Sequence, residues 1–373
     1  MTGDRVRVLH VVQSMNYGGM ERVIADLITH TDPARFELHL LCLEYLGRFS
    51  EGLDKAASLH VAPPMPRLSF LNPSELAKQI RAIAPDIVHT HSGVWYKGSL
   101  AARRAGVASL IHTEHGRRSP DPFADRFFDG LAARRTDVVV AVSEQLAHEL
   151  PRTLRIPPQK VVCIPNGIDV DLYRPHPDTG TLRRELGLSP SAPIVGSIGR
   201  LEPIKCYDAT IRAFAQFTAT EVGRDAHLVI GGEGTSRPEL EQLAARLGVS
   251  SQVHLLGWRD DIHDLLSAFT LFTMSSRSEG TSISLLEAMS SGVPPVVTDV
   301  GGNRAVVGPD LADALVPFGD TTALTVAWAR TLASSGAQSK RAALSRQRVA
   351  DAFSSLAAAE AYERVYVGVV RRD

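Results

Sequence analysis

Two acidic residues, Glu279 and Glu287, lie eight positions apart in a stretch whose pattern suits a charged, hydroxyl-bearing ligand. Glu279 follows a short apolar run, and a helix is expected over residues 281–290, so Glu287 comes about two helical turns later. The first N–H groups of a helix lack intrahelical partners, and the helix dipole favours anions there. Carboxylates accept paired hydrogen bonds from neighbouring hydroxyls. The pattern predicts that two acids bind sugar rings while amides bind a diphosphate, the amides being those of Gly280, Thr281, Ser282 and Ile283.

Two cations, Arg200 and Lys205, follow the strand expected over residues 193–197. Lys205 is one of only six lysines in the chain. Such cations neutralise a diphosphate and the charge that grows on it as it departs. The alternative is a pair of surface cations beside a turn.

Other candidates occupy the ends of expected strands. Gly231 lies in a glycine turn, which either approaches a ligand closely or is a plain tight turn. Trp258 and Arg259 follow a further strand, where a side chain for packing is as expected as one for binding.

In the first half of the chain, Gly18 and Gly19 separate the first strand from the first helix. His115 follows the strand expected over residues 109–112, and that position favours it over His89, His91 and His112.

The elements that position these residues form two successive β/α series. Expected strands and helices alternate from residue 5 to 150, then pause over a proline-rich stretch, and resume at residue 193. Alternation of this kind predicts an α/β protein with two Rossmann-like, doubly wound domains that face each other across a cleft. The expected domains are 1–170 and 171–354, and residues 355–373 form a terminal helix expected to cross back to the first domain.

The composition of the chain excludes several classes of protein and of partner. The 373 residues are 44% hydrophobic and 22% charged with a formal net charge of -1, so nothing calls for a nucleic acid partner. Three cysteines without a C-x-x-C pair favour a reducing compartment, and we expect a cytoplasmic protein. No segment approaches the roughly 18 apolar residues of a membrane span.

The segment E-G-T-S-I-S-L-L-E-A-M-x-x-G-V-P resembles the E-x7-E signature of the family 4 retaining glycosyltransferases, and the likeness covers nearly the whole chain. The family has the GT-B fold and often builds bacterial surface polysaccharides. The resemblance implies that Glu287 binds the ribose and Glu279 the transferred sugar. It also implies that Arg200 and Lys205 bind the diphosphate, that residues 256–259 pass the nucleobase, and that His115 and the Gly18–Gly19 loop lie near the reacting sugar.

The implied reaction moves a sugar from a nucleotide diphosphate to a hydroxyl of a glycan or lipid-linked acceptor, with retention at the anomeric carbon. A UDP-sugar is the first expectation for the donor and GDP-mannose the second. No D-x-D element lies at a strand end, so no metal and no other cofactor is expected, and Asp260 and Asp261 are interpreted as helix caps. The alternatives are a sugar-nucleotide epimerase on this scaffold and a non-catalytic sugar-nucleotide-binding protein.

Two departures from the family pattern affect these expectations. Cys206 replaces the glycine that usually follows the lysine, and Asn303 and Arg304 stand where a glutamate often follows the Gly301–Gly302 pair. Paired arginines in the first half are either a solvated face or a contact with an anionic acceptor at a membrane surface: Arg103, Arg104, Arg117, Arg118, Arg134 and Arg135.

Overall fold

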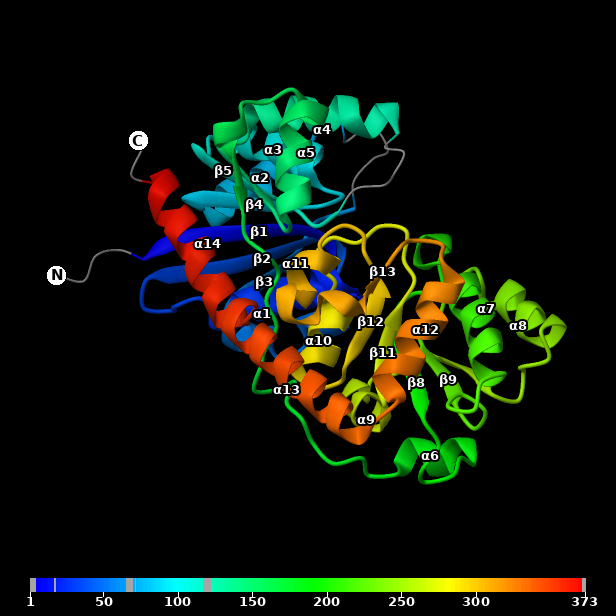
Figure 1. Ribbon diagram of the computed structural model, residues 1–373. Coiled ribbons are helices and arrows are strands. Elements are labelled where there is room, and N and C mark those ends of the chain that lie inside the picture. Colours follow the sequence, from blue (N-terminus) through cyan, green and yellow to red (C-terminus); the bar gives the residue numbers. More distant parts are fainter. Residues whose placement is uncertain (1–4, 17, 65–69, 71, 117–121, 371–373) are drawn as a thin grey trace. The chain divides into compact units, whose positions relative to one another are not determined.

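The structure is a computed structural model that describes residues 5–16, 18–64, 70, 72–116 and 122–370. The chain forms two compact units (Figure 1). Unit 1 contains the chain up to Gly167 together with the segment from Ser355 onward, and unit 2 contains Ile168–Ser354. The sequence places the division after residue 170, whereas the chain divides between Gly167 and Ile168.

Unit 1 is built on a parallel sheet of seven strands within the described residues, in the order β3-β2-β1-β4-β5-β6-β7. Its strands are β1 Val6–Ser14, β2 Phe36–Tyr45, β3 Ala57–Val61, β4 Ile87–His91, β5 Ser109–Glu114, β6 Val138–Ala141 and β7 Val161–Cys163. Its helices are α1 Gly19–His30, α2 Ser74–Ile83, α3 Trp95–Ala105, α4 Phe123–Arg135, α5 Glu144–Leu154 and α14 Ser355–Val370.

Unit 2 repeats this plan with six parallel strands in the described chain, in the order β10-β9-β8-β11-β12-β13. Its strands are β8 Ile194–Ile198, β9 His227–Gly231, β10 Val253–Gly257, β11 Leu271–Met274, β12 Pro295–Thr298 and β13 Leu315–Val316. Its helices are α6 Thr181–Leu186, α7 Tyr207–Thr218, α8 Arg237–Arg246, α9 Ile262–Ala268, α10 Ile283–Ser290, α11 Asn303–Val307, α12 Thr321–Leu332 and α13 Ser335–Ala352.

Helices cover each sheet on both faces. Neighbouring residues of a strand point to opposite sides, so each strand contributes to two cores. In β1, Val8 packs in the core that contains residues of α1 and α14, and Leu9 packs in the core that contains residues of α2 and α3. In β8, Ile194 and Val195 divide in the same way between the cores of α10 and α7. The prediction of two doubly wound, Rossmann-like domains is confirmed.

The strand order reverses its direction between β1 and β4 in unit 1 and between β8 and β11 in unit 2. Ligands of such sheets bind beyond the carboxyl ends of the strands at this reversal. Among the described residues, no helix is long and apolar enough to cross a bilayer.

Helix α14 follows all of unit 2 in sequence but packs in the core of unit 1, against α1 and the sheet (Figure 1). Tyr366 is fully buried, its ring meets Phe36 edge-on at 5.7 Å, and its hydroxyl bonds Nδ1 of His89 at 2.9 Å. Nearby, Glu363 forms an ion pair with Arg35 at 2.6 Å. The core of unit 1 therefore depends on this helix.

Replacing Tyr366 with alanine should lower the free energy of unfolding of unit 1 by about 3–5 kcal/mol, because the change leaves a large cavity in the core. The measurement is urea unfolding. Leu356→Ala on the exposed side of the same helix should change this free energy by less than about 0.5 kcal/mol. Equal effects of the two changes would contradict the packing role of α14.

Candidate functional site

The centre of the candidate site in unit 2 is an ion pair between Lys205 and Glu279. Nζ of Lys205 lies 2.7 Å from Oε1 of Glu279, and the two side chains are 19% and 9% exposed. Lys205 ends a short 3-10 helix after β8, and Glu279 lies between β11 and α10. Because β8 and β11 are neighbours in the sheet, two residues 74 positions apart meet at the reversal of strand order.

Two glycines hold the backbone of Glu279 in place. A Cβ atom on Gly301 would collide with the carbonyl oxygen of Glu279, and one on Gly302 would collide with that of Gly280. The N–H of Gly302 donates to both carbonyls, at 3.3 and 3.2 Å. Gly301 also has a φ of 55°, in the left-handed region. The glycine pair after β12 is therefore required for the position of Glu279.

The backbone around Lys205 is held by the segment that follows β11. The N–H of Arg277 donates to the carbonyl of Ile204 at 2.9 Å, and the hydroxyl of Ser275 donates to the carbonyl of Cys206 at 2.8 Å. The ion pair thus joins two loops that are already tied together through their main chains.

Tyr207, the first residue of α7, is a member of this site that the sequence did not indicate. Its hydroxyl lies 3.3 Å from Oγ of Ser197 and would be 2.9 Å from a Cβ on Gly199. Burial raises the pKa of Tyr207 above its usual value, and the charge of Glu279 raises it further. The uncharged side chain of Tyr207 therefore lines the site beside Lys205 and Glu279. In the sequence, the only sign of this role is its position at the start of α7, shortly after Lys205.

Helix α10 begins at Ile283 and Ser282 is its N-cap, so the predicted start at Thr281 is two residues early. The cause is the extended backbone of Ser282, with ψ of 118°, which delays the first turn. The N–H groups at the helix start are consequently those of Ile283, Ser284 and Leu285. Thr281 and Ser282 are buried just before it, and Glu287 on the second turn is only 7% exposed.

Arg200 lies two residues beyond β8 and is exposed. Gly231 ends β9, where a Cβ would be 3.1 Å from Cδ1 of Leu265, so close packing against α9 is one reason for a glycine here. Trp258 is 46% exposed, and its Nε1 donates to Asp260 at 3.1 Å.

The guanidinium of Arg259 is already paired with two carboxylates. It contacts Asp261 at 2.8 and 2.6 Å and Glu185 at 2.7 Å. The hydrogen bonds that Arg259 donates to both carboxylates raise its pKa, and the bond from Arg259 lowers the pKa of Asp261. Asp261 occupies the N-cap position of α9, as predicted, but its side chain makes no cap bond and pairs with Arg259 instead. The predicted contact of residue 259 with a ligand is left to its backbone.

In unit 1, Gly18 and Gly19 mark the start of α1, directly after β1. A Cβ on Gly18 would collide with the carboxylate of Glu21, which lies over this helix start. The side chain of Glu21 would have to move before an anion could approach these amides.

His115 follows β5, and its backbone N–H donates to Oγ of Ser92 at 2.9 Å. Its Nε2 lies 3.1 Å from Nδ1 of His91. Burial lowers the pKa of His115 to about 4, with a smaller contribution from His112 and an opposing one from Glu114. The imidazole is therefore neutral near pH 7. The sequence ranked His91 below His115, whereas the structure joins them.

Three buried histidines, His10, His89 and His91, have ring nitrogens within 4.8 Å of one another, a spacing that a metal ion could use. However, both nitrogens of His89 already have partners, the hydroxyls of Tyr366 at 2.9 Å and Thr113 at 2.8 Å. The chemistry of this group fits a hydrogen-bonded network better than a metal centre.

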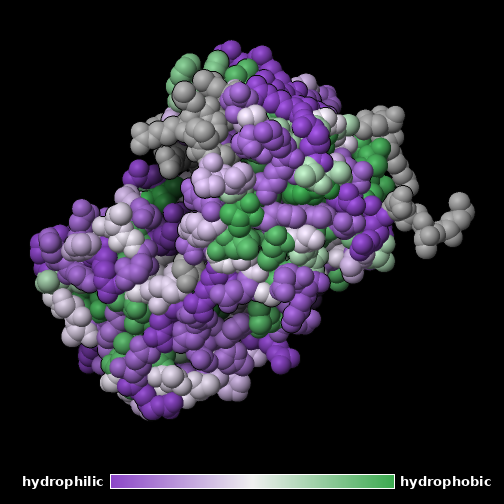
Figure 2. Space-filling model, turned by 180° about the vertical axis from the view of Figure 1, so that it is seen from behind, coloured by the Kyte–Doolittle hydropathy of each residue, from purple (hydrophilic) through white to green (hydrophobic). Residues whose placement is uncertain are grey.

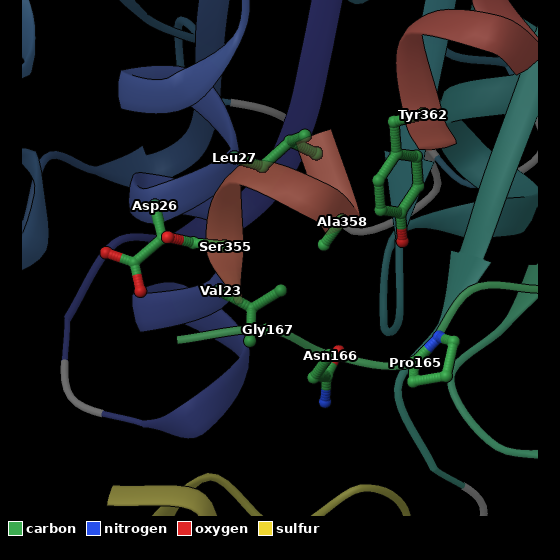
Figure 3. A pocket seen from close by; sticks show the side chains of 9 residues that line it. All are labelled: Val23, Asp26, Leu27, Pro165, Asn166, Gly167, Ser355, Ala358 and Tyr362. Carbon is green, nitrogen blue, oxygen red and sulfur yellow. The ribbon is translucent and has the colours of Figure 1, made fainter. Parts of the chain in front are cut away.

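A small pocket in unit 1 lies apart from the predicted site residues (Figure 3). Side chains of α1 and α14 line it together with the segment that leads out of unit 1, and the nine lining residues are Val23, Asp26, Leu27, Pro165, Asn166, Gly167, Ser355, Ala358 and Tyr362. It is interpreted as a packing defect where α14 meets the segment that leaves the unit.

The departure at Cys206 has a structural meaning, because its φ of 50° and ψ of 43° lie in the left-handed region. This conformation disfavours every residue with a Cβ. We expect Cys206→Gly to be more stable to urea unfolding than Cys206→Ala by about 0.5–1 kcal/mol. Both changes remove the thiol, which lies 3.3 Å from the carbonyl of Pro203, so their difference isolates the backbone. A more stable alanine variant would refute this account.

Comparison with known proteins finds two matching family models. The model described as Glycosyltransferase Family 4 matches residues 17–172. The model described as Glycosyl transferases group 1 matches residues 192–334. The first match covers most of the strands and helices of unit 1, and the second covers most of those of unit 2.

Individual proteins are similar over much of the chain. A UDP-Gal:alpha-D-GlcNAc-diphosphoundecaprenol alpha-1,3-galactosyltransferase of Escherichia coli is 27% identical over 333 residues, 86% of each chain. A D-inositol 3-phosphate glycosyltransferase of Nocardia farcinica is 31% identical over 258 residues, 64% of this chain and 56% of the relative. A solved structure, Anabaena HepE in complex with UDP-glucose, matches in fold with a TM-score of 0.83 at 23% identity, covering 98% of this chain and 100% of that one. The chain belongs to the group 1, family 4 glycosyltransferases and is itself a glycosyltransferase of the GT-B fold.

Proposed function

We propose that the site around Lys205 and Glu279 binds a nucleotide-diphosphate sugar and transfers its sugar to an acceptor hydroxyl. The observation that carries this proposal is the Lys205–Glu279 ion pair, at the strand reversal of unit 2 and directly before the start of α10. A cation for phosphate, a carboxylate for sugar hydroxyls and the free amides of a helix start thus occur in one place.

In the proposed complex, Lys205 turns from Glu279 to the diphosphate, and the exposed Arg200 joins it there. The amide of Ile283 at the helix start and those of the preceding loop from Gly280 lie along the same phosphates, and Glu287 accepts hydrogen bonds from the ribose. Once Lys205 is shared with the diphosphate, Glu279 is free to accept hydrogen bonds from the sugar. Positive charge and amides stabilise the departing phosphate without a metal ion.

The reaction we propose retains the anomeric configuration. The bond between the anomeric carbon and the phosphate oxygen breaks, and the acceptor hydroxyl oxygen bonds to that carbon on the same face. The hydroxyl proton passes to the departing phosphate oxygen, so no side chain has to act as the base. Negative charge grows most on the departing phosphate, which is where the proposal puts Lys205 and Arg200.

For the donor we propose a UDP-sugar, with GDP-mannose as the second choice. The name of the Escherichia coli relative includes UDP-Gal, and Anabaena HepE was solved with UDP-glucose. For the acceptor we propose a glycan or a lipid-linked glycan, since the name of the same relative includes a diphosphoundecaprenol.

The test is a comparison of nucleotide binding and sugar transfer, carried out in EDTA because no metal is proposed. UDP, GDP and ADP are compared by thermal shift, since a nucleotide at about 100 times its Kd stabilises the fold by about 2.7 kcal/mol. We expect UDP to raise the melting temperature most. We expect Glu279→Gln to lower kcat for transfer from a UDP-sugar by about 100-fold or more while UDP still binds, because the sugar loses its charged partner.

Glu221→Gln makes the same change at an exposed acid of unit 2 and should leave transfer unaffected. Absence of nucleotide binding and of transfer would refute the proposal. Conversion of the UDP-sugar without an acceptor would indicate an epimerase instead. If wild type and Glu279→Gln were equally inert while UDP bound, the protein would be a non-catalytic sugar-nucleotide-binding protein.

We further propose that helix α4 of unit 1 brings the enzyme to an anionic membrane surface. Phe123 and Phe127, one turn apart, are 82% and 53% exposed, and Arg126 and Arg134 on the same helix are exposed as well. Exposed aromatic rings beside cations suit the boundary between lipid headgroups and water.

Two of the paired arginines already have partners within unit 1. Arg103 is occupied by Asp137 at 3.1 Å and by the carbonyls of Val107 and Ala108, and Arg104 contacts Asn72. Arg117 and Arg118 lie outside the described residues.

On the face drawn in Figure 2, hydrophobic residues form small patches bordered by hydrophilic ones, and no single broad apolar surface is seen there.

The wild-type protein should sediment with phosphatidylserine-containing vesicles at low salt and be released at high salt, because the arginines bind the surface electrostatically. Phe123→Ala combined with Phe127→Ala should lower the bound fraction severalfold, since two exposed rings no longer enter the interface. Val326→Ala combined with Leu356→Ala removes exposed apolar side chains elsewhere and serves as the control. Equal binding by both double variants would refute the role of α4.

A further inference from the structure

Three imidazoles form a hydrogen-bonded row in unit 1. Nε2 of His115 lies 3.1 Å from Nδ1 of His91, and Nε2 of His91 lies 3.1 Å from Nδ1 of His10. His10 belongs to β1, His91 ends β4, and His115 follows β5, so three adjacent strands supply the row. His10 and His91 are buried almost completely.

All three rings are neutral near pH 7. Burial lowers the pKa of His10 to about 3 and that of His115 to about 4, and it lowers the pKa of His91 well below the usual value. The neighbouring His89 and His112 lower the pKa of His91 further. The other titratable groups beside the row are Glu114 of β5, which opposes the shift of His115, and Tyr366 of α14, whose ring lies 6.4 Å from that of His10 and whose own pKa burial raises. Tyr362 of the same helix packs on His89, and burial raises its pKa as well.

A neutral imidazole has one N–H and one bare nitrogen, so each contact in the row needs an N–H on one side and a lone pair on the other. Only two arrangements satisfy both contacts. Either all three rings carry the proton on Nδ1, or all three carry it on Nε2. The tautomer of His115 is therefore linked to those of His91 and His10.

The two ends of the row decide between these arrangements. Nε2 of His10 and Nδ1 of His115 are buried and have no hydrogen-bond partner among the described residues. A buried N–H without a partner is rarer in proteins than a bare acceptor. The Nε2-protonated arrangement leaves such an N–H on His10, deep in the core. The Nδ1-protonated arrangement leaves it on His115, which is less buried as a residue than His10 and follows the carboxyl end of β5, the edge at which ligands of such sheets bind.

We propose that His91 and His10 are positioning residues that hold His115 in the Nδ1–H tautomer, so that His115 donates a hydrogen bond to an oxygen of the nucleotide sugar. The oxygen is a sugar hydroxyl or a phosphate oxygen, and this assignment of the ligand rests on the proposed function. His115 with Nδ1 protonated has no lone pair for the ligand, and its other nitrogen accepts from His91. It is a fixed donor and takes no proton from the acceptor.

The first test does not require activity. In the 15N-histidine-labelled full chain, long-range 1H–15N NMR spectra distinguish the two neutral tautomers from the charged ring. We expect His10, His91 and His115 all to be neutral with Nδ1 protonated from pH 6 to 8. A charged His115 at pH 7, opposite tautomers of His91 and His115, or stoichiometric zinc found on the row by elemental analysis would overturn the proposal.

The second test separates positioning from packing. His91→Phe keeps a ring but removes the donor to His115, and His91→Asn places an amide N–H near the former Nδ1. We expect His91→Phe to abolish the single Nδ1–H state of His115 and to lower kcat/KM for transfer about tenfold, as for one lost hydrogen bond. His91→Asn should restore most of both. UDP carries the diphosphate but no sugar, so unchanged UDP binding in His91→Phe assigns the bond to a sugar hydroxyl, and weaker UDP binding that His91→Asn restores assigns it to a phosphate oxygen.

His112→Phe is the matched control, because His112 is a buried histidine of β5 that stacks on Trp95 and lies outside the row. It should keep the tautomer of His115. Loss of kcat/KM in His91→Phe with an unchanged His115 tautomer would overturn the proposal. If the wild type transferred no sugar at all, the proposed function would fail, and the spectra would still decide whether the row exists as described.

Discussion

The candidate site of unit 2 depends on pairing a carboxylate with a cation where little water reaches them. Glu279 is nearly buried, and an unpaired charge in such a place is costly. Lys205 compensates the charge, Gly301 and Gly302 allow a second loop to close on the backbone of Glu279, and Ser275 ties the lysine loop to the same region. Cys206 accepts a left-handed backbone directly after the lysine as part of this arrangement. Pairs of this kind contribute little net stability, and their value lies in fixing where the charges are.

Much of the fold could be predicted from the sequence because its strands are apolar runs between turn residues. The expected strand at residues 109–112 is observed as the first four residues of β5. The short strands β7 and β13 were not predicted, since three and two residues give no measurable periodicity. Helix α10 starts late for a local reason, the extended backbone of Ser282, which composition does not reveal.

The segments that form the site could be predicted from the sequence. The contacts between side chains of different segments could not. Motif spacing places Lys205 and Glu279 at strand ends, but only the adjacency of β8 and β11 brings them into contact. The same limit applies to His10 and His91, whose meeting depends on the register between β1 and β4. Arg259 shows the opposite case, because a cation at a strand end proves to be committed to Glu185 and Asp261. Local pattern identifies candidates, and long-range register decides their partners.

The chain leaves unit 1 at Gly167 and returns to it at Ser355, and next to these crossings the N–H of Ile168 donates to the carbonyl of Phe353. On a ribosome, the residues of α14 emerge after the whole of unit 2. Unit 1, although it is synthesised first, therefore cannot complete its core until the segment that follows unit 2 has been made. Until then the apolar face that Tyr362, Tyr366 and Val369 later cover stays open.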